Sequence, residues 1–249
     1  MSGWIFLRGL TRESRHWGDL PEHWCAHGLP APLMIDLPGN GSARHLDVPA
    51  NVRGMTEAVR ATAQATGRSG PWCILAMSLG AMVATDWAQA WPGEVSGLVL
   101  VNTSMRPFSH PAERLRPRNW LAMLGMARHW HDRARCERVV HRLTCERLDT
   151  RDADLARWVD IGQTASVSRD AAWLQLVAAA RFRAQRQAPG CPTLVVSSDA
   201  DRLVNPNCSA RLAAAWGVSH ARHPWAGHDL PHDDPQWLCE TAGAAMDRR

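Results

Sequence analysis

The segment Trp72-Cys-Ile-Leu-Ala-Met-Ser78-Leu-Gly80-Ala-Met-Val-Ala84 decides the fold of this chain. It joins an apolar run, which predicts a strand buried on both faces, to a serine and then to a helical stretch. Ala76 and Gly80 lie two residues before and after Ser78, and a sharp turn from strand to helix needs such small side chains. The helix that follows would direct free N–H groups and its positive dipole end at the turn, which favours an alkoxide or oxyanion. Ser78 is therefore a candidate nucleophile, although the A-x-S-x-G pattern alone also fits an ordinary turn.

Other apolar runs recur along the chain, each closed by turn residues, and they predict strands at Trp4–Leu7, Leu33–Ile35, Trp72–Met77, Leu98–Val101, Thr193–Val196 and Val218–His223. Helices are predicted between them, at Met55–Ala65, Ala81–Ala90, Ser209–Trp216 and Pro235–Met246. Continuous apolar runs are typical of strands that are covered on both faces. The alternation predicts an α/β fold with a mostly parallel, doubly wound sheet of about six strands.

The pattern changes between Met105 and Gln187, where no convincing strand is found. Arg-rich amphipathic helices are predicted there, at Asn119–Arg128, Arg138–Leu148, Asp154–Gly162 and Asp170–Arg181. This region looks like a helical insertion between two strands of the sheet. We therefore expect a core formed by residues 1–103 and 188–249, with a helical cap, residues 104–187, inserted in it.

The composition is that of an ordinary globular protein, with 249 residues of which 45% are hydrophobic and 21% charged. A chain of this length can bury one substantial core. No segment approaches the roughly 18 apolar residues that a membrane helix needs. The apolar run near the N-terminus is too short for a secretory leader. We expect a cytoplasmic protein without membrane insertion.

Seven cysteines are spread along the chain without a C-x-x-C pair. An odd, widely spaced set suggests neither a disulfide framework nor a zinc site. The sequence therefore predicts no metal and no cofactor.

The positive charge is concentrated in the expected cap, which holds 16 arginines against 9 acidic residues. Such a charge could steer an acidic partner or an anionic substrate towards the protein. It could equally belong to solvated helix faces on which arginines pair with neighbouring acids. Nucleic-acid binding is not expected, because no recognised binding motif accompanies the charge.

Two further signals lie downstream of Ser78. The predicted strand at Thr193–Val196 is followed by Asp199 and Asp201, and carboxylates at such a place either form part of a site or cap a turn. His228 lies in a Gly-flanked loop before the last predicted helix. The order Ser, Asp, His, with each residue after its own strand, is the order of a hydrolase triad on an α/β sheet.

These three residue types serve one chemistry. A serine hydroxyl is a poor nucleophile until a neutral imidazole takes its proton, and a carboxylate holds that imidazole in the required tautomer. We predict Ser78 as nucleophile and His228 as base, with Asp199 or Asp201 as the acid that orients His228.

Motifs spread over nearly the whole chain resemble the α/β-hydrolase family: Leu7-Arg-Gly-Leu10, Asp36-Leu-Pro-Gly-Asn-Gly41, Ala76-Met-Ser-Leu-Gly80, Gly97-Leu-Val-Leu-Val-Asn102, Asp201-Arg-Leu-Val204 and Gly227-His-Asp-Leu-Pro231. The resemblance implies that Asp201, rather than Asp199, is the acid that orients His228, because Asp-x-x-Val-x-Pro follows the strand at the family's spacing. It implies an oxyanion hole formed by the backbone N–H groups of Leu10 and Leu79. It also implies that Ser14 and Trp17 line the mouth of the site.

The chain departs from the family pattern at two positions. Arg8 replaces the usual histidine before the first oxyanion glycine, and Ala76 replaces the first glycine of the nucleophile turn. Backbone donors do not depend on side-chain identity, so Arg8 changes the polarity of the pocket more than the catalysis. The cap residues Trp120 and Met123 are candidates to line the pocket, although helical spacing also fits core packing for these and other apolar cap residues.

A serine at the turn disfavours the epoxide hydrolase and dehalogenase branches of the family, which use aspartate. We expect a carboxylesterase that acts on small or medium acyl esters. The alternatives are a carrier-protein-linked acyl methyl esterase or a thioesterase, a carbon–carbon bond hydrolase, and a non-catalytic ligand-binding homologue. The Arg-rich cap resembles that of the carrier-protein methyl esterases of biotin synthesis, so an acyl carrier protein is the candidate protein partner.

A fluorophosphonate probe should label Ser78 covalently, because a nucleophile turn, oxyanion donors and a base together would activate this serine among many. Mass spectrometry of the labelled protein would locate the adduct. Labelling that survives Ser78→Ala would show that another residue is the nucleophile.

Overall fold

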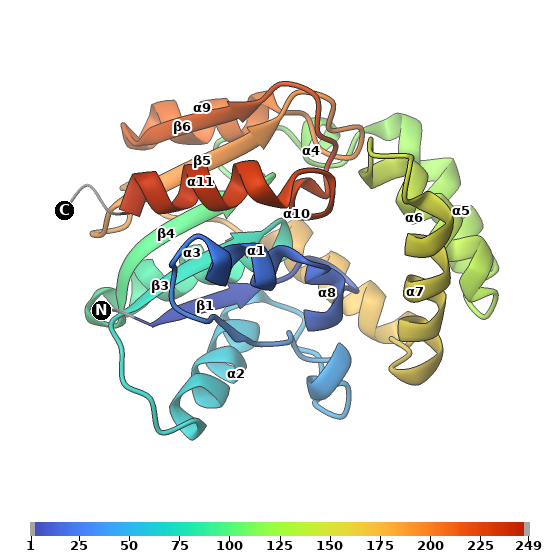
Figure 1. The fold of residues 1–249 in the computed structure, drawn as a ribbon, viewed down its shortest axis with the longest axis horizontal. Helices are drawn as coiled ribbons and strands as arrows, with labels where there is room; N and C mark the ends of the chain where they lie inside the picture. Colours follow the sequence, from blue (N-terminus) through green and yellow to red (C-terminus); the bar gives the residue numbers. More distant parts are fainter. Residues whose placement is uncertain (1–2, 247–249) are drawn as a thin grey trace.

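The sheet is the centre of the molecule. A computed structural model describes residues 3–246, and in this part of the chain six strands form one sheet in the order β2-β1-β3-β4-β5-β6, with all neighbours parallel (Figure 1). The strands are β1 Trp4–Leu7, β2 Leu33–Met34, β3 Trp72–Met77, β4 Val95–Val101, β5 Thr193–Ser198 and β6 Ser219–His223. The predicted parallel α/β sheet is thereby confirmed.

Helices cover both faces of the sheet because successive strand residues point to opposite sides. Trp4 and Phe6 of β1 point to the same face of the sheet, which is covered by α1 Leu20–Ala26 and α11 Pro235–Met246. Ile5 and Leu7 pack on the other face, whose helices are α2 Val52–Ala65, α3 Leu79–Ala90 and α9 Asn207–Trp216. The central strands β1, β3, β4 and β5 are therefore buried on both faces, as the continuous apolar runs predict, whereas the edge strands β2 and β6 are partly exposed.

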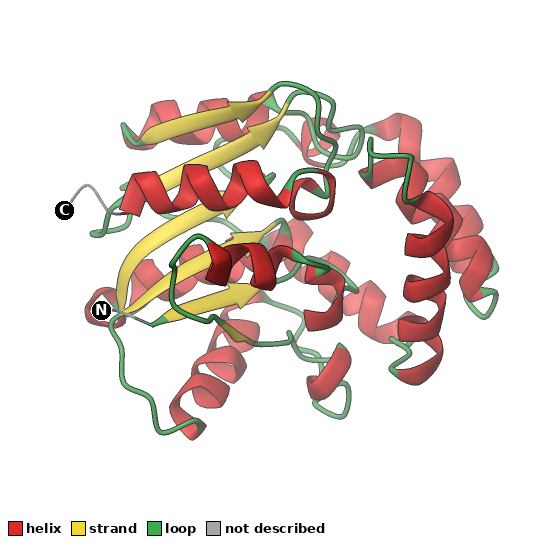
Figure 2. Ribbon diagram, viewed as in Figure 1, coloured by secondary structure: helices red, strands yellow, loops and turns green. Residues whose placement is uncertain are grey.

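Five helices follow β4 before the chain returns to the sheet at β5: α4 Pro111–Arg114, α5 Trp120–Arg128, α6 Arg133–Thr144, α7 Arg151–Thr164 and α8 Arg169–Arg181. The strand arrowheads point towards α5, α6 and α7, so these helices lie beyond the carboxyl ends of the strands (Figures 1 and 2). We keep the name cap for residues 104–187. α8 runs back to the core, where Ala178 is completely buried.

The limits of several elements differ from those expected. α6 begins at Arg133 rather than Arg138, because the Asp132 side chain accepts a hydrogen bond from the Arg135 amide (2.9 Å) and caps the helix there. It ends at Thr144 rather than Leu148. The two-turn helix α1 and the one-turn helices α4 and α10 Leu230–Asp233 were not expected.

Among residues 3–246, no helix combines the length and the apolar character that crossing a bilayer requires.

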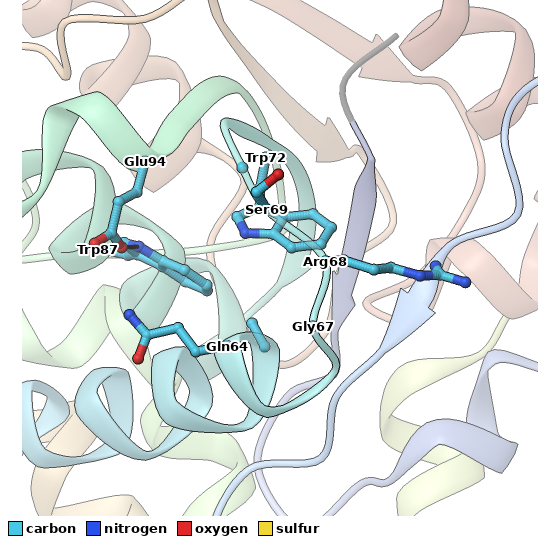
Figure 3. Close-up of a pocket in the computed structure, with 9 residues that line it drawn as sticks. Gln64, Gly67, Arg68, Ser69, Trp72, Trp87 and Glu94 are labelled. Atoms are coloured by element: carbon cyan, nitrogen blue, oxygen red, sulfur yellow. Dashed lines mark hydrogen bonds between the residues drawn. The ribbon is translucent and has the colours of Figure 1, made fainter.

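A hollow at the amino end of β3 lies far from Ser78, which follows the opposite end of that strand. Gln64, Arg68 and Ser69 line it together with the indoles of Trp72 and Trp87 (Figure 3). Its one carboxylate, Glu94, is already engaged by Arg60 and by the Trp87 indole N–H (2.7 Å). The carboxylate of this hollow is therefore already paired.

The start of α3 lies against the backbone of β1. A Cβ atom on Gly80 would be 2.5 Å from the carbonyl oxygens of both Leu7 and Arg8. Only glycine fits there without moving α3, and with it the turn that carries Ser78.

We expect Gly80→Ala to lower the free energy of unfolding by roughly 1–3 kcal/mol, the usual cost of overpacking. Gly125→Ala in α5 is the matched control, since its Cβ would meet nothing within 4 Å and helix propensity favours alanine by about 1 kcal/mol. Urea denaturation of both variants measures the difference. Equal stability of Gly80→Ala and the unmodified protein would contradict the close approach.

Candidate active site

Ser78 lies on a strained turn between β3 and α3. Its φ of 53° and ψ of −115° are unusual for a residue with a side chain. Its N–H donates to the carbonyl of Val101 (2.9 Å), and its own carbonyl accepts from Thr103 Oγ1 (3.0 Å). Strain of this kind persists only where surrounding contacts hold it, and such positions concentrate at functional sites.

His228 and Asp201 form a buried pair. Nδ1 of His228 lies 2.7 Å from Oδ2 of Asp201, and the two side chains are 4% and 2% exposed. The other carboxylate oxygen of Asp201, Oδ1, accepts hydrogen bonds from the backbone N–H groups of Leu203 (2.8 Å) and Val204 (2.9 Å). Asp201 is thus held by the loop that follows β5, so it can hold the imidazole in one orientation.

Asp199, the other carboxylate after β5, points elsewhere. It is exposed and pairs with Arg222 of β6, whose Nη2 lies 2.9 Å from Oδ1. Of the two candidate acids, the structure brings only Asp201 to His228.

A cavity of about 520 Å³ lies between the carboxyl ends of the strands and the cap. Ser78 and His228 both line it, as do Arg8 and Leu10. Asp201 is not among the described lining residues and lies behind His228. Leu79 is buried and is the first residue of α3. The backbone N–H of a first helical residue has no acceptor within its own helix.

The cap contributes most of the apolar wall of this cavity. Trp120 and Met123 line it, together with Leu124 and Trp173. Trp120, Leu124 and Trp173 are more than half exposed, at 52%, 66% and 62%, so core packing is wrong for them. Trp158 does pack inside, at 3% exposure.

Trp17 does not line the described cavity, so its expected place at the mouth is wrong. It is 1% exposed and packs on Phe6, with ring centroids 5.1 Å apart, while the Arg8 guanidinium lies over it at 4.9 Å. Ser14 is also absent from the described lining, and its amide donates to Asp36 (2.7 Å). The 3₁₀ helix Ser14–Trp17 turns the indole towards the sheet rather than towards the cavity.

Arg8 forms a buried two-pronged ion pair with Asp229, the residue after His228. Its Nη1 and Nη2 lie 2.9 and 2.7 Å from the two carboxylate oxygens, and both side chains are 3% exposed. Burial by itself raises the pKa of Asp229, but the charge and hydrogen bonds of Arg8 outweigh it and hold that pKa below its ordinary value. Arg8 thereby fixes the loop that carries His228, a role that sequence reasoning missed.

Asn102, at the end of β4, was also missed. Its Nδ2 donates to Ser198 Oγ (2.9 Å) and to the carbonyls of Gly227 (3.2 Å) and His228 (2.8 Å). Its Oδ1 accepts the Ser198 amide (2.9 Å). A polar residue closing an otherwise apolar strand was the available signal, but its partners are distant in sequence.

A polar corner of the cavity links the core to the cap. Arg12 Nη1 lies 2.7 Å from Glu137 Oε2 of α6 and 3.0 Å from His16 Nε2. Burial, and then the charges of Arg12 and Arg8, hold the pKa of His16 well below its ordinary value. A neutral imidazole therefore lies at this corner.

The parallel sheet, the strained serine turn after β3 and the histidine loop after β6 are arranged as in the α/β hydrolases. Residues 5–234 match the family described as serine aminopeptidase, S33. The chain belongs to this α/β-hydrolase family.

Among curated proteins, the candidate carbamate hydrolase RutD of Klebsiella pneumoniae (strain 342) is 32% identical over 163 residues, which cover 63% of this chain and 59% of RutD. The match therefore spans about three fifths of the length of that relative. RutD of Klebsiella variicola (strain At-22) matches to the same extent.

Solved structures share the fold at low sequence identity. The enol-lactonase of Burkholderia xenovorans LB400 has a TM-score of 0.79 and 17% identity, with 100% of this chain and 92% of that chain covered. A hydrolase of Pseudomonas aeruginosa PA01 has a TM-score of 0.78 and 18% identity, covering 98% and 90% of the two chains. At this identity the likeness establishes the fold.

We expect Asp201→Asn to lower turnover by about three to four decades, as loss of the triad acid does in proteases, because His228 would lose the group that orients it. Asp199→Asn is the matched control and should keep nearly full turnover. Steady-state kinetics on an activated ester, with circular dichroism to check folding, gives the comparison. A crippled Asp199→Asn beside an active Asp201→Asn would exchange the two roles.

Proposed function

We propose that this member of the α/β-hydrolase family is a serine carboxylesterase that cleaves small to medium acyl esters. Ser78 is the nucleophile, His228 the base and Asp201 the acid that orients it. The observation that carries the proposal is the 2.7 Å contact between His228 and Asp201, in a cavity that His228 shares with the strained Ser78.

In this mechanism, Nε2 of His228 takes the proton of Ser78 Oγ while that oxygen attacks the ester carbonyl. The N–H groups of Leu10 and Leu79 stabilise the oxyanion of the tetrahedral intermediate. His228 then gives the proton to the departing alcohol, which leaves an acyl group on Ser78. Water releases the acid by the same steps, with His228 again acting first as base.

The shape and lining of the cavity support an apolar acyl group. Its volume of about 520 Å³ lies within the roughly 300–1,000 Å³ typical of small-molecule sites. Leu10 and Met77 from the core face Trp120, Met123 and other apolar cap residues across it. One structural neighbour is named as an enol-lactonase, and a lactone is an internal ester, which agrees with this reaction class.

The arrangement of charges in the cap favours a second candidate, hydrolysis of an acyl ester or thioester carried by an acyl carrier protein. Three cap acids pair with core arginines rather than with neighbours in the cap: Glu113 with Arg211, Glu137 with Arg12 and Glu146 with Arg202. These three acids therefore do not neutralise arginines of the cap, whereas Asp149 pairs within the cap with Arg147 (3.6 Å). Arg138 and Arg142 are exposed on α6, and within residues 3–246 neither forms an ion pair with an acidic side chain. An acidic carrier protein could use these arginines.

Short p-nitrophenyl esters should be hydrolysed with a kcat/KM that changes little between low and high salt, because a neutral substrate gains nothing from long-range charge. Arg138→Gln and Arg142→Gln should leave this value nearly unchanged, whereas Ser78→Ala should abolish it. Initial rates on a panel of esters, thioesters and amides of increasing acyl length provide the measurement.

A preference of several decades for acyl carrier protein substrates, removed by salt or by those arginine substitutions, would promote the second candidate. Turnover of amides or of carbon–carbon bonds instead of esters would reassign the reaction. Probe binding without turnover of any substrate would favour the non-catalytic homologue.

A further inference from the structure

A second cluster of reactive side chains lies where the end of α6 meets α10. It consists of His141 on α6, Cys145 directly after that helix and His232 on α10. One potential ligand atom from each of these residues lies within 4.8 Å of the others. None of the three lines the cavity that holds Ser78, so the proposed esterase chemistry does not use them.

His141 has a polar atom without a partner. Its side chain is 1% exposed, and within residues 3–246 no group hydrogen-bonds to its Nε2. The nearest charged group is Oδ2 of Asp154 on α7, 3.8 Å away. A buried nitrogen left unsatisfied costs free energy, so a ligand at this point would remove a real penalty.

His232 is already oriented towards the same point. Its Nε2 lies 2.8 Å from Asp154 Oδ2, while its Nδ1 lies 3.2 Å from Asp233 Oδ1. Backbone amides hold Asp233 in turn, those of Gly227 (2.7 Å) and Glu146 (3.0 Å) among them. A histidine whose far nitrogen is bonded to a fixed carboxylate is the usual arrangement of a metal ligand.

We propose that His141 Nε2, His232 Nε2, Cys145 Sγ and Asp154 Oδ2 form a structural Zn²⁺ site. Two imidazole nitrogens, a thiolate and a carboxylate oxygen are donors that zinc accepts in tetrahedral geometry. On binding, the Cys145 thiol and Nε2 of His232 each release a proton to solvent. Nδ1 of His232 keeps its proton and its hydrogen bond to Asp233.

The distances suit such a site after small side-chain movements. Bonds of about 2.0–2.3 Å in a tetrahedron place the ligand atoms about 3.3–3.7 Å apart. The ligand atoms of His141, Cys145 and His232, with separations up to 4.8 Å, therefore have to approach one another by about 1 Å, which side-chain rotation can supply. Asp154 Oδ2 already lies 3.8 Å from His141 Nε2 and 2.8 Å from His232 Nε2. The Trp158 ring, with centroids 5.4 Å from His141 and 5.5 Å from His232, closes one side of the cluster with apolar surface.

The proposal replaces the expectation of no zinc site, which rested on the absence of C-x-x-C. The spacing His141-x-x-x-Cys145 brings Cys145, directly after the end of α6, one turn beyond His141, and that signal was overlooked. Four protein ligands leave no open position, so the metal would be structural. It would join the cap helices α6 and α7 to α10, which follows the His228 loop.

The test uses untagged full-length protein, first stripped with a chelator and then incubated with one equivalent of Zn²⁺ and desalted. We expect one Zn²⁺ per chain by mass spectrometry and a higher Tm than in the stripped protein. Cys145→Ser and His141→Gln should lose both effects. Cys136→Ser is the matched control, since it removes a different buried cysteine, on α6, whose Sγ hydrogen-bonds to the carbonyls of Met126 (3.8 Å) and His129 (3.5 Å).

Co²⁺ provides a readout that does not depend on the variants folding. In the unmodified protein we expect a thiolate-to-cobalt charge-transfer band in the near ultraviolet, retained in Cys136→Ser. No such band, metal well below one equivalent, or metal that remains in folded Cys145→Ser would overturn the site. A band that persists in Asp154→Asn at unchanged intensity would remove Asp154 from the ligand set and overturn the four-residue site.

Discussion

The carboxamide of Asn102 is the contact on which the arrangement of the candidate site depends. It lies where β4 ends, and it binds the end of β5 through Ser198 and the histidine loop through the carbonyls of Gly227 and His228. The strand that precedes the acid loop and the loop that presents the base are thereby tied to one buried side chain. The Ser78 N–H also donates a hydrogen bond to the carbonyl of Val101, the neighbour of Asn102. The segments that carry the three residues of the proposed triad are therefore all anchored at the end of β4.

Buried charge strengthens this frame from two sides. Arg8 pairs with Asp229 next to the base, and Arg12 pairs with Glu137 of the cap. Removing one partner of such a pair leaves an uncompensated buried charge, which typically costs about 3–5 kcal/mol. The two pairs therefore hold the loop after β1 to the histidine loop on one side and to α6 on the other.

Local patterns predicted the elements that depend on neighbours in sequence. The strand at Trp72–Met77 and the serine turn follow from an apolar run and small residues, and the fold class follows from repetition of that pattern. The place of Trp17 could not be predicted, because its partners Phe6 and Arg8 lie on another element. The same holds for Arg8, whose acid is 221 residues away, and for the cap acids, which pair across the fold. Short helices such as α1 escaped notice because two buried residues, Leu20 and Trp24, make too weak a periodic signal.

Unlike α6, α7 and α8, the helix α5 has no buried residue among its nine, although several of them line the cavity. α6, by contrast, is tied to the core through Glu137 and through the Thr144 carbonyl, which accepts the Asp229 amide (2.8 Å). Exposed positions tolerate substitution with little loss of stability. Natural variation in α5 can therefore change which molecules are admitted to the cavity without endangering the folded state, and a new substrate range can evolve at this helix before any residue around Ser78 has to change.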